Sequence, residues 1–181
     1  MKPISVTTAL SPWSDFTGIP EAVLREAAER GTLCHNLFAG YALGLFPGDI
    51  PKQAMGFFNS FKVWFDKYVD HIYWVEKELI DNDLGIIGHA DAGIRLVDGQ
   101  NYVVDWKTPA AASKTWGPQT AAYFKMADKC CEENYDAAMI LQPKKDGGMA
   151  KATVYKKSES DRNWVVFASA LNCFRYFKGE K

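Results

Sequence analysis

The sequence has no long apolar run, no C-x-x-C cysteine pair and no excess of charge of either sign. A membrane-spanning helix needs roughly 20 consecutive apolar residues, and no segment reaches that length. The start of the chain also lacks the apolar stretch of a secretory signal peptide. With 21 Lys and Arg against 22 Asp and Glu, the chain is no polybasic nucleic-acid binder. We therefore expect an intracellular, cytoplasmic protein without a membrane partner.

The four cysteines also lack the spacing of a common metal or redox motif. They are Cys34, Cys130, Cys131 and Cys173. On a helix, the adjacent Cys130 and Cys131 would point about 100° apart, which suits neither a zinc site nor an ordinary disulfide. We interpret all four as small buried side chains.

The length and composition are those of an ordinary globular protein. The 181 residues fit a single domain, 1–181, and 48% of them are hydrophobic. Charge is distributed unevenly, since residues 1–100 hold 8 basic and 13 acidic side chains and residues 101–181 hold 13 and 9. The basic second half could contact phosphates, although a solvated surface explains the same asymmetry.

Hydrophobic periodicity predicts an α/β fold with a mixed central sheet flanked by helices. Residues 3–18, with their Pro and Gly, are expected to be an irregular lead-in. The helices are expected at 21–45, with a break at Gly31, and at 51–71, 114–133 and 160–177. The strands are expected at 72–80, 85–97, 101–107, 136–142 and 150–156.

An acid and an amine stand close together at the end of the 101–107 strand. Side chains alternate between the faces of a strand, so Asp105 and Lys107 share one face. The Asp98-Gly99 pair predicts a hairpin that places Asp91 opposite Asp105 or Lys107.

Two carboxylates at cross-strand distance repel each other unless a cation joins them. Oxygen-rich sites favour Mg²⁺ or Mn²⁺, and two acids, a lysine and such a cation suit phosphodiester hydrolysis. The alternative is a surface ion pair, which is the commoner meaning of an isolated D-x-K.

Several short motifs in a fixed order resemble the RecB-type branch of the PD-(D/E)xK nucleases. The resemblance covers most of the chain, and its closest likeness is to the group that holds mitochondrial genome maintenance exonuclease and its phage and bacterial relatives. The matching motifs are Ser5-Val6-Thr7, Arg30-Gly31-Thr32-x-x-His35, Val75-Glu76, Gly88-x-x-Asp91, Asp105-Trp106-Lys107-Thr108 and Gln119-x-x-x-Tyr123.

The resemblance implies a restriction-endonuclease-like core and a metal site. Asp91 and Asp105 would bind Mg²⁺ or Mn²⁺, together with the backbone carbonyl of Trp106. Lys107 would position or activate the attacking water. Arg30, in the first helix, would contact the substrate.

The resemblance also implies supporting residues around this centre. His35 would approach the metal, the alternative being a hydrogen-bonded core histidine. Glu76 would join the catalytic and metal site, and Glu78 is the alternative because it lies two residues further along the strand. Gln119 and Tyr123, one helical turn apart, would brace the site or touch DNA, unless they are ordinary polar residues of a helix surface.

The sequence departs from this branch at some positions. Some members hold an iron–sulfur cluster with one early and three late cysteines, but the late cysteines here are not clustered, so we predict no cluster. His89 is unusual within G-x-x-D and is expected to be a surface residue or a phosphate contact. His71 is expected to be structural.

We therefore predict a Mg²⁺-dependent deoxyribonuclease. The resemblance indicates an exonuclease that works in DNA recombination, repair or end-processing, in a phage or its bacterial host. The partner is DNA, held with the help of a homo-oligomer or a recombination protein. One alternative is a non-catalytic DNA-binding module of the same fold. Another is an enzyme using Lys107 in a Schiff base, which the neighbouring Asp105 disfavours.

Overall fold

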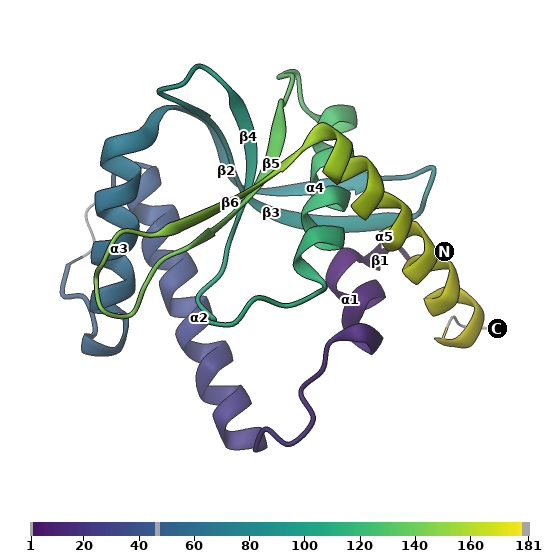
Figure 1. Ribbon diagram of the computed structural model, residues 1–181, viewed down its shortest axis with the longest axis horizontal. Helices are drawn as coiled ribbons and strands as arrows, with labels where there is room; N and C mark the ends of the chain where they lie inside the picture. Colours follow the sequence, from purple (N-terminus) through teal and green to yellow (C-terminus); the bar gives the residue numbers. More distant parts are fainter. Residues whose placement is uncertain (1, 46–47, 179–181) are drawn as a thin grey trace.

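A mixed six-stranded sheet lies between two groups of helices (Figure 1). This computed structural model describes residues 2–45 and 48–178. The helical elements are α1 (Val6–Leu10), the 3-10 turn η1 (Ser11–Trp13), α2 (Glu21–Ala42), α3 (Lys52–Tyr68), α4 (Trp116–Cys130) and α5 (Lys157–Lys178). The strands are β1 (Ile4–Ser5), β2 (Val69–Asp81), β3 (Ile86–Leu96), β4 (Asn101–Trp106), β5 (Ala137–Gln142) and β6 (Lys151–Lys156). The predicted α/β class with a mixed, helix-flanked sheet is confirmed.

The strand order leaves an opening in the middle of the sheet. The path runs β1-β3-β4-β5-β6, and β2 pairs with β3 along nearly its whole length. The other edge of β3 is shared, because β1 pairs with it at Ile86 and Ile87 and β4 pairs with it from Ala92 to Arg95. Residues 88–91 therefore face the gap between β1 and β4.

Each face of the sheet is covered by its own helices. On one face, α1, α4 and α5 pack over a core that includes Leu79, Phe124 and Phe167. On the other, α2 and α3 pack over a more aromatic core that includes Phe61 and Trp106. Burial of these two apolar layers, at about 25 cal/mol per Å², is the main force that fixes the helices on the sheet.

Strand β3 changes face at Asp91. Ile86 and Ala90 pack into the α4 side, whereas Ala92 and Ile94, which have the same parity, pack against α2 and α3. Side chains of a regular strand would keep alternating, so the strand must twist or bend between residues 90 and 92. Asp91 thus stands at the crossing point between the two layers, beside the opening.

The expected order of helices and strands holds from residue 21 onward, and four details of the prediction need correction. Residues 3–18 are not merely irregular, because Ile4 pairs with Ile86 and the Ser5 side chain caps α1 by accepting a hydrogen bond from the Thr8 amide at 3.0 Å. Gly31 does not break α2, since helix packing outweighs its low helix propensity of about 1 kcal/mol.

Two helix ends also differ from expectation. Helix α2 ends at Ala42, before the predicted residue 45, and Gly44 follows with φ +75°, a conformation typical of helix C-termini. Helix α3 ends at Tyr68 instead of 71, so His71 belongs to β2, where it is exposed and contacts the Tyr73 ring. Over residues 2–45 and 48–178, none of the helices is both long and apolar enough to cross a bilayer.

Candidate metal centre

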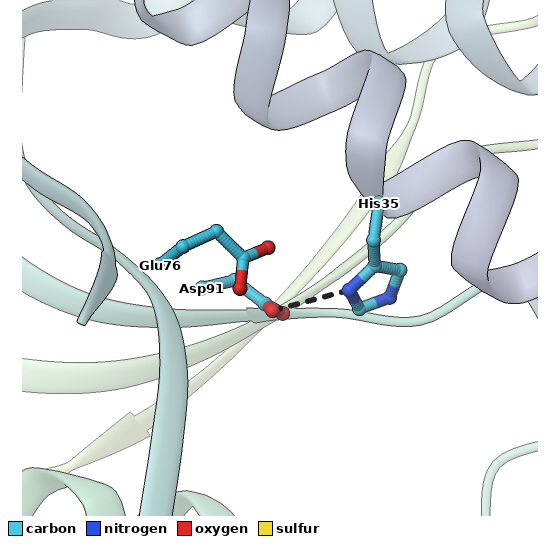
Figure 2. A group of neighbouring side chains, drawn as sticks. All are labelled: His35, Glu76 and Asp91. Atoms are coloured by element: carbon cyan, nitrogen blue, oxygen red, sulfur yellow. Dashed lines mark hydrogen bonds and ion pairs between the residues drawn. The ribbon is translucent and has the colours of Figure 1, made fainter. Parts of the chain in front are cut away.

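Three potential metal ligands meet beside the opening in the sheet. His35 comes from α2, Glu76 from β2 and Asp91 from β3, and one ligand atom of each lies within 4.8 Å of the others (Figure 2). Elements from one helical layer and from two neighbouring strands thus converge on one point. No single stretch of sequence contains this set.

Asp91 is the most buried member of the group. Its side chain is buried, and Oδ1 lies 3.1 Å from Nδ1 of His35. Its other oxygen, Oδ2, accepts a hydrogen bond from the backbone N–H of Trp106 at 2.5 Å. These two contacts hold the carboxylate in a single orientation between α2 and β4.

A second carboxylate and the lysine lie next to this group. Asp105 is 3% exposed, and its Oδ2 lies 2.7 Å from Nζ of Lys107. The hairpin register pairs Ala92 with Val104, so Asp91 and Asp105 stand at the next opposed position. The structure thus brings together Asp91, Asp105 and Lys107.

Two buried polar side chains of α4 support Asp105. Gln119 Nε2 lies 3.2 Å from Asp105 Oδ1 and 3.1 Å from the Tyr123 hydroxyl, and it donates to both. Gln119 is 7% exposed and Tyr123 is 3% exposed. The alternative of ordinary helix-surface polarity is therefore wrong for both residues.

Two acidic side chains of the site, those of Glu76 and Asp105, hold their protons more tightly than usual. Partial burial of its carboxyl group, and then the charge of Asp91, raise the pKa of Glu76, although the side chain as a whole is exposed. Burial raises the pKa of Asp105 against the opposing charge of Lys107, and Asp91 raises it further. For His35, burial lowers the pKa, but the hydrogen bond and charge of Asp91 outweigh it and the pKa is raised. A divalent cation would relieve this crowding of carboxylates.

The donor set fits a divalent cation of the Mg²⁺ or Mn²⁺ type. Carboxylate oxygens are the ligands these ions prefer, and one imidazole nitrogen is compatible with Mn²⁺ in particular. The ligands offered are those of His35, Glu76 and Asp91, with Asp105 alongside. The predicted role of the Trp106 carbonyl stays a prediction, since the contact seen involves the Trp106 amide.

The residues around the metal centre enclose a cavity of about 310 Å³. Its lining includes Ser5, Val6 and Thr7, which the sequence placed in an irregular segment. The S-V-T motif was the only signal in the sequence that could have placed these three residues at the metal cavity. Gly88, the glycine of G-x-x-D, has no room for a side chain, because a Cβ there would lie 2.6 Å from the Tyr123 ring.

Some predicted residues lie outside this cavity. Arg30 lines a different, neighbouring cavity. Glu78, the alternative to Glu76, forms an exposed ion pair with His89 at 3.2 Å. His89 still borders the metal cavity, while Glu78 does not.

The cysteine interpretation needs correction. Only Cys34 is buried; Cys131 is half-buried, and Cys130 and Cys173 are exposed. The last two lie at the end of α4 and on α5, where those helices present one side to solvent. Burial raises the pKa of the Cys34 thiol to about 11, which keeps it protonated and unreactive.

Glu76 has a strained backbone, which yields a test. Its φ is +52°, and it is the one non-glycine residue with positive φ in the described part of the chain. Such a conformation costs roughly 1–2 kcal/mol.

Glu76→Gly removes this strain, so the variant is expected to match or exceed the metal-free stability of the parent. It should also bind metal more weakly, because it lacks the carboxylate. Glu78→Gly, the matched control, should lose about 0.5–1 kcal/mol and leave metal binding unchanged. Urea unfolding with and without Mn²⁺ measures both effects; equal losses of stability would contradict a role for strain.

Comparison with known proteins identifies no family. No protein-family model matches the chain, and no curated protein matches it. One solved structure, "Crystal structure of SSO0001", shares 17% identity and a TM-score of 0.33, over 56% of this chain and 50% of that one. The chain thus spans about half the length of that structure, and a similarity this low establishes neither a shared fold nor a shared function.

Proposed function

We propose that this chain is a metal-dependent nuclease that hydrolyses phosphodiester bonds in DNA. The observation that carries the proposal is the convergence of His35, Glu76 and Asp91 next to the ion pair of Asp105 and Lys107. Carboxylates crowded in a partly buried site raise each other's free energy, and a bound divalent cation would offset that repulsion. A lysine directly beside them adds the positive charge that phosphate chemistry uses.

The protein side chains would divide the work in the following way. His35, Glu76 and Asp91 would hold the cation, with Asp91 kept in place by the Trp106 amide. When bound, a divalent cation supplies Lewis acidity toward a phosphoryl oxygen and lowers the pKa of water. Asp91 is buried and His35 is half-buried, which strengthens the electrostatic contact between them, whereas Glu76 is exposed.

Lys107 would act on the attacking water or on the developing negative charge. Its Nζ is fixed 2.7 Å from Asp105 Oδ2, and Asp105 is held in turn by Gln119. The side chain is 18% exposed, so it reaches the cavity while its orientation is restricted. This chain of contacts, with Tyr123 behind Gln119, would orient the ammonium group without its having to reorganise during the reaction.

The resemblance of the motifs to RecB-type nucleases supports three further parts of the proposal. These are DNA as the substrate, an exonuclease mode of cleavage and a restriction-endonuclease-like core. The same resemblance supports a role in recombination, repair or end-processing in a phage or bacterium, with a homo-oligomer or a recombination protein as helper. The non-catalytic alternative would leave the lysine and its acids without a use. We therefore favour catalysis.

End-labelled single- and double-stranded DNA, incubated with Mg²⁺, Mn²⁺ or EDTA, tests the proposal. We expect cleavage with either metal and none with EDTA. Metal should also raise the melting temperature, because a ligand at about 100 times its Kd adds about 2.7 kcal/mol of stability. Thermal stabilisation without cleavage of any DNA form would favour the non-catalytic module. Cleavage in EDTA would contradict the metal site.

A further inference from the structure

We propose that a second cavity, next to the metal centre, binds backbone phosphates of the DNA strand that enters the site. This inference rests on the proposed function and extends it by naming where the strand lies. The cavity has a volume of about 580 Å³ and lies between α2, α3, the loop after β4 and the turn between β5 and β6.

The lining of this cavity is strongly basic. Four cationic side chains border it, from Arg30, Lys144, Lys145 and Lys151, against one carboxylate, from Asp146. Within residues 2–45 and 48–178, none of the four cations forms an ion pair shorter than 4.0 Å. By contrast, lysines 62, 125 and 129 all pair with carboxylates. Unpaired positive charge gathered around a hollow attracts anions.

Arg30 adds an unsatisfied donor to this surface. Its Nε atom is buried and has no hydrogen-bond partner among the described residues, while its guanidinium lies 6.0 Å from the centre of the Phe57 ring. A buried donor without a partner costs about 1–3 kcal/mol. An anion in the cavity that contacted Nε would remove that cost.

The turn that carries the lysines is held in place. The Lys144 amide donates to the Ser60 hydroxyl at 2.8 Å. Gly56 of α3 packs so closely that a Cβ there would lie 1.7 Å from the Lys145 carbonyl oxygen. The side-chain amide of Gln142, the last residue of β5, donates to the Pro109 carbonyl at 3.2 Å and joins the end of β5 to the loop after β4. The cations are therefore presented on a fixed frame.

The two cavities adjoin at the end of β4. Lys107 borders the metal cavity and the next residue, Thr108, borders the basic one. On α2, His35 borders the metal cavity and Arg30 borders the basic one. The five residues between them correspond to about 7.5 Å along the helix axis. A strand with one phosphate at the metal would thus place neighbouring phosphates at the basic cavity.

The remaining lining favours a nucleotide strand over free phosphate. Phe57, Pro109, Ala110 and Pro143 contribute apolar surface between the cations. Sugars and bases can pack on such surface, whereas inorganic phosphate gains nothing from it. Hence the ligand is an oligonucleotide.

The test compares two double variants of equal charge change. Lys144→Ala/Lys145→Ala removes two cations of the cavity. Lys156→Ala/Lys157→Ala removes two exposed lysines outside it, the last residue of β6 and the first residue of α5. Binding of a fluorescein-labelled single-stranded oligonucleotide is measured by anisotropy in EDTA, over a range of salt concentrations. The first variant should bind about 10-fold more weakly at low salt, and its plot of log K against log salt should be shallower by about 1.4. The control should stay within about 2-fold of the parent.

Equal weakening in both variants, or in neither, would overturn the inference. Competition with inorganic phosphate separates the two sources of the ligand: displacement of the oligonucleotide by phosphate at similar concentrations would mean a free-phosphate site and would also overturn it. Because binding is measured in EDTA, the result does not depend on cleavage. A protein with the expected binding contrast but no nuclease activity would contradict the proposed function alone.

Discussion

Lys107→Ala is expected to lower the rate of DNA cleavage by about 10²- to 10³-fold while the protein still gains stability from metal. The lysine ammonium lies 2.7 Å from Asp105 and contacts none of the three groups that would hold the cation. Its removal therefore takes positive charge from the reaction without dismantling the metal centre. Single-turnover cleavage and metal-dependent melting temperature measure the two effects separately.

The control for this variant is Lys125→Ala. Lys125 also forms an ion pair, at 2.6 Å from Asp161, and its side chain is 31% exposed, but it lies outside the cavity. We expect its cleavage rate to stay within about 2-fold of the parent, since such exposed pairs contribute at most about 1 kcal/mol. A Lys107 variant that cleaves at the parental rate would refute the role of the lysine. Loss of metal stabilisation in that variant would place Lys107 in the metal site itself.

Asp91→Asn is expected to abolish both metal-dependent stabilisation and cleavage. Asp91 contacts His35, and its ligand oxygen lies within 4.8 Å of that of Glu76, so its charge is central to the group. The amide oxygen of asparagine can still accept from the Trp106 amide, which keeps the local structure. In the absence of metal, the variant should be at least as stable as the parent, because the charge of Asp91 raises the pKa of both Glu76 and Asp105.

Asp70→Asn is the matched control for this variant. Asp70 lies on β2 and pairs with Arg95 of β3 at 2.6 Å, at the far end of the same strand pair. Its loss should leave cleavage and metal stabilisation unchanged. If metal raised the melting temperature of Asp91→Asn as much as that of the parent, Asp91 would be excluded as a metal ligand.

The pH dependence of the parent follows from the same groups. The raised pKa values of Glu76, Asp105 and His35 mean that the folded, metal-free protein holds protons more tightly than the unfolded chain. Their contribution to metal-free stability is therefore present at acidic pH and lost as pH rises through these values. Metal must displace those protons, so metal stabilisation should weaken between about pH 8 and about pH 6. Metal titrations of the melting temperature across this range check the trend.

The sequence alone determined the part of the site that lies on one hairpin. Alternation of side chains puts Asp105 and Lys107 on one face, and the Asp98-Gly99 turn sets the register that places Asp91 beside them. The α/β class and the element order are equally local, because they depend on hydrophobic period and on turn residues. The structure contains these features as predicted, because residues close together in the sequence are enough to determine them.

Only the tertiary structure decided what surrounds that hairpin. The packing of α2 and α4 on opposite faces brings His35 to Asp91 and Gln119 to the neighbouring Asp105. The left-handed backbone at Glu76 accompanies its placement in the cluster, while Glu78 is left outside. Arg30, expected to contact the substrate, lies with Lys144 and Lys145 in the neighbouring cavity. The rotation of each helix about its axis and the face change of β3 at Asp91 depend on how the side chains of the two apolar cores pack together. Local sequence patterns do not encode this packing, because it involves residues far apart in the chain.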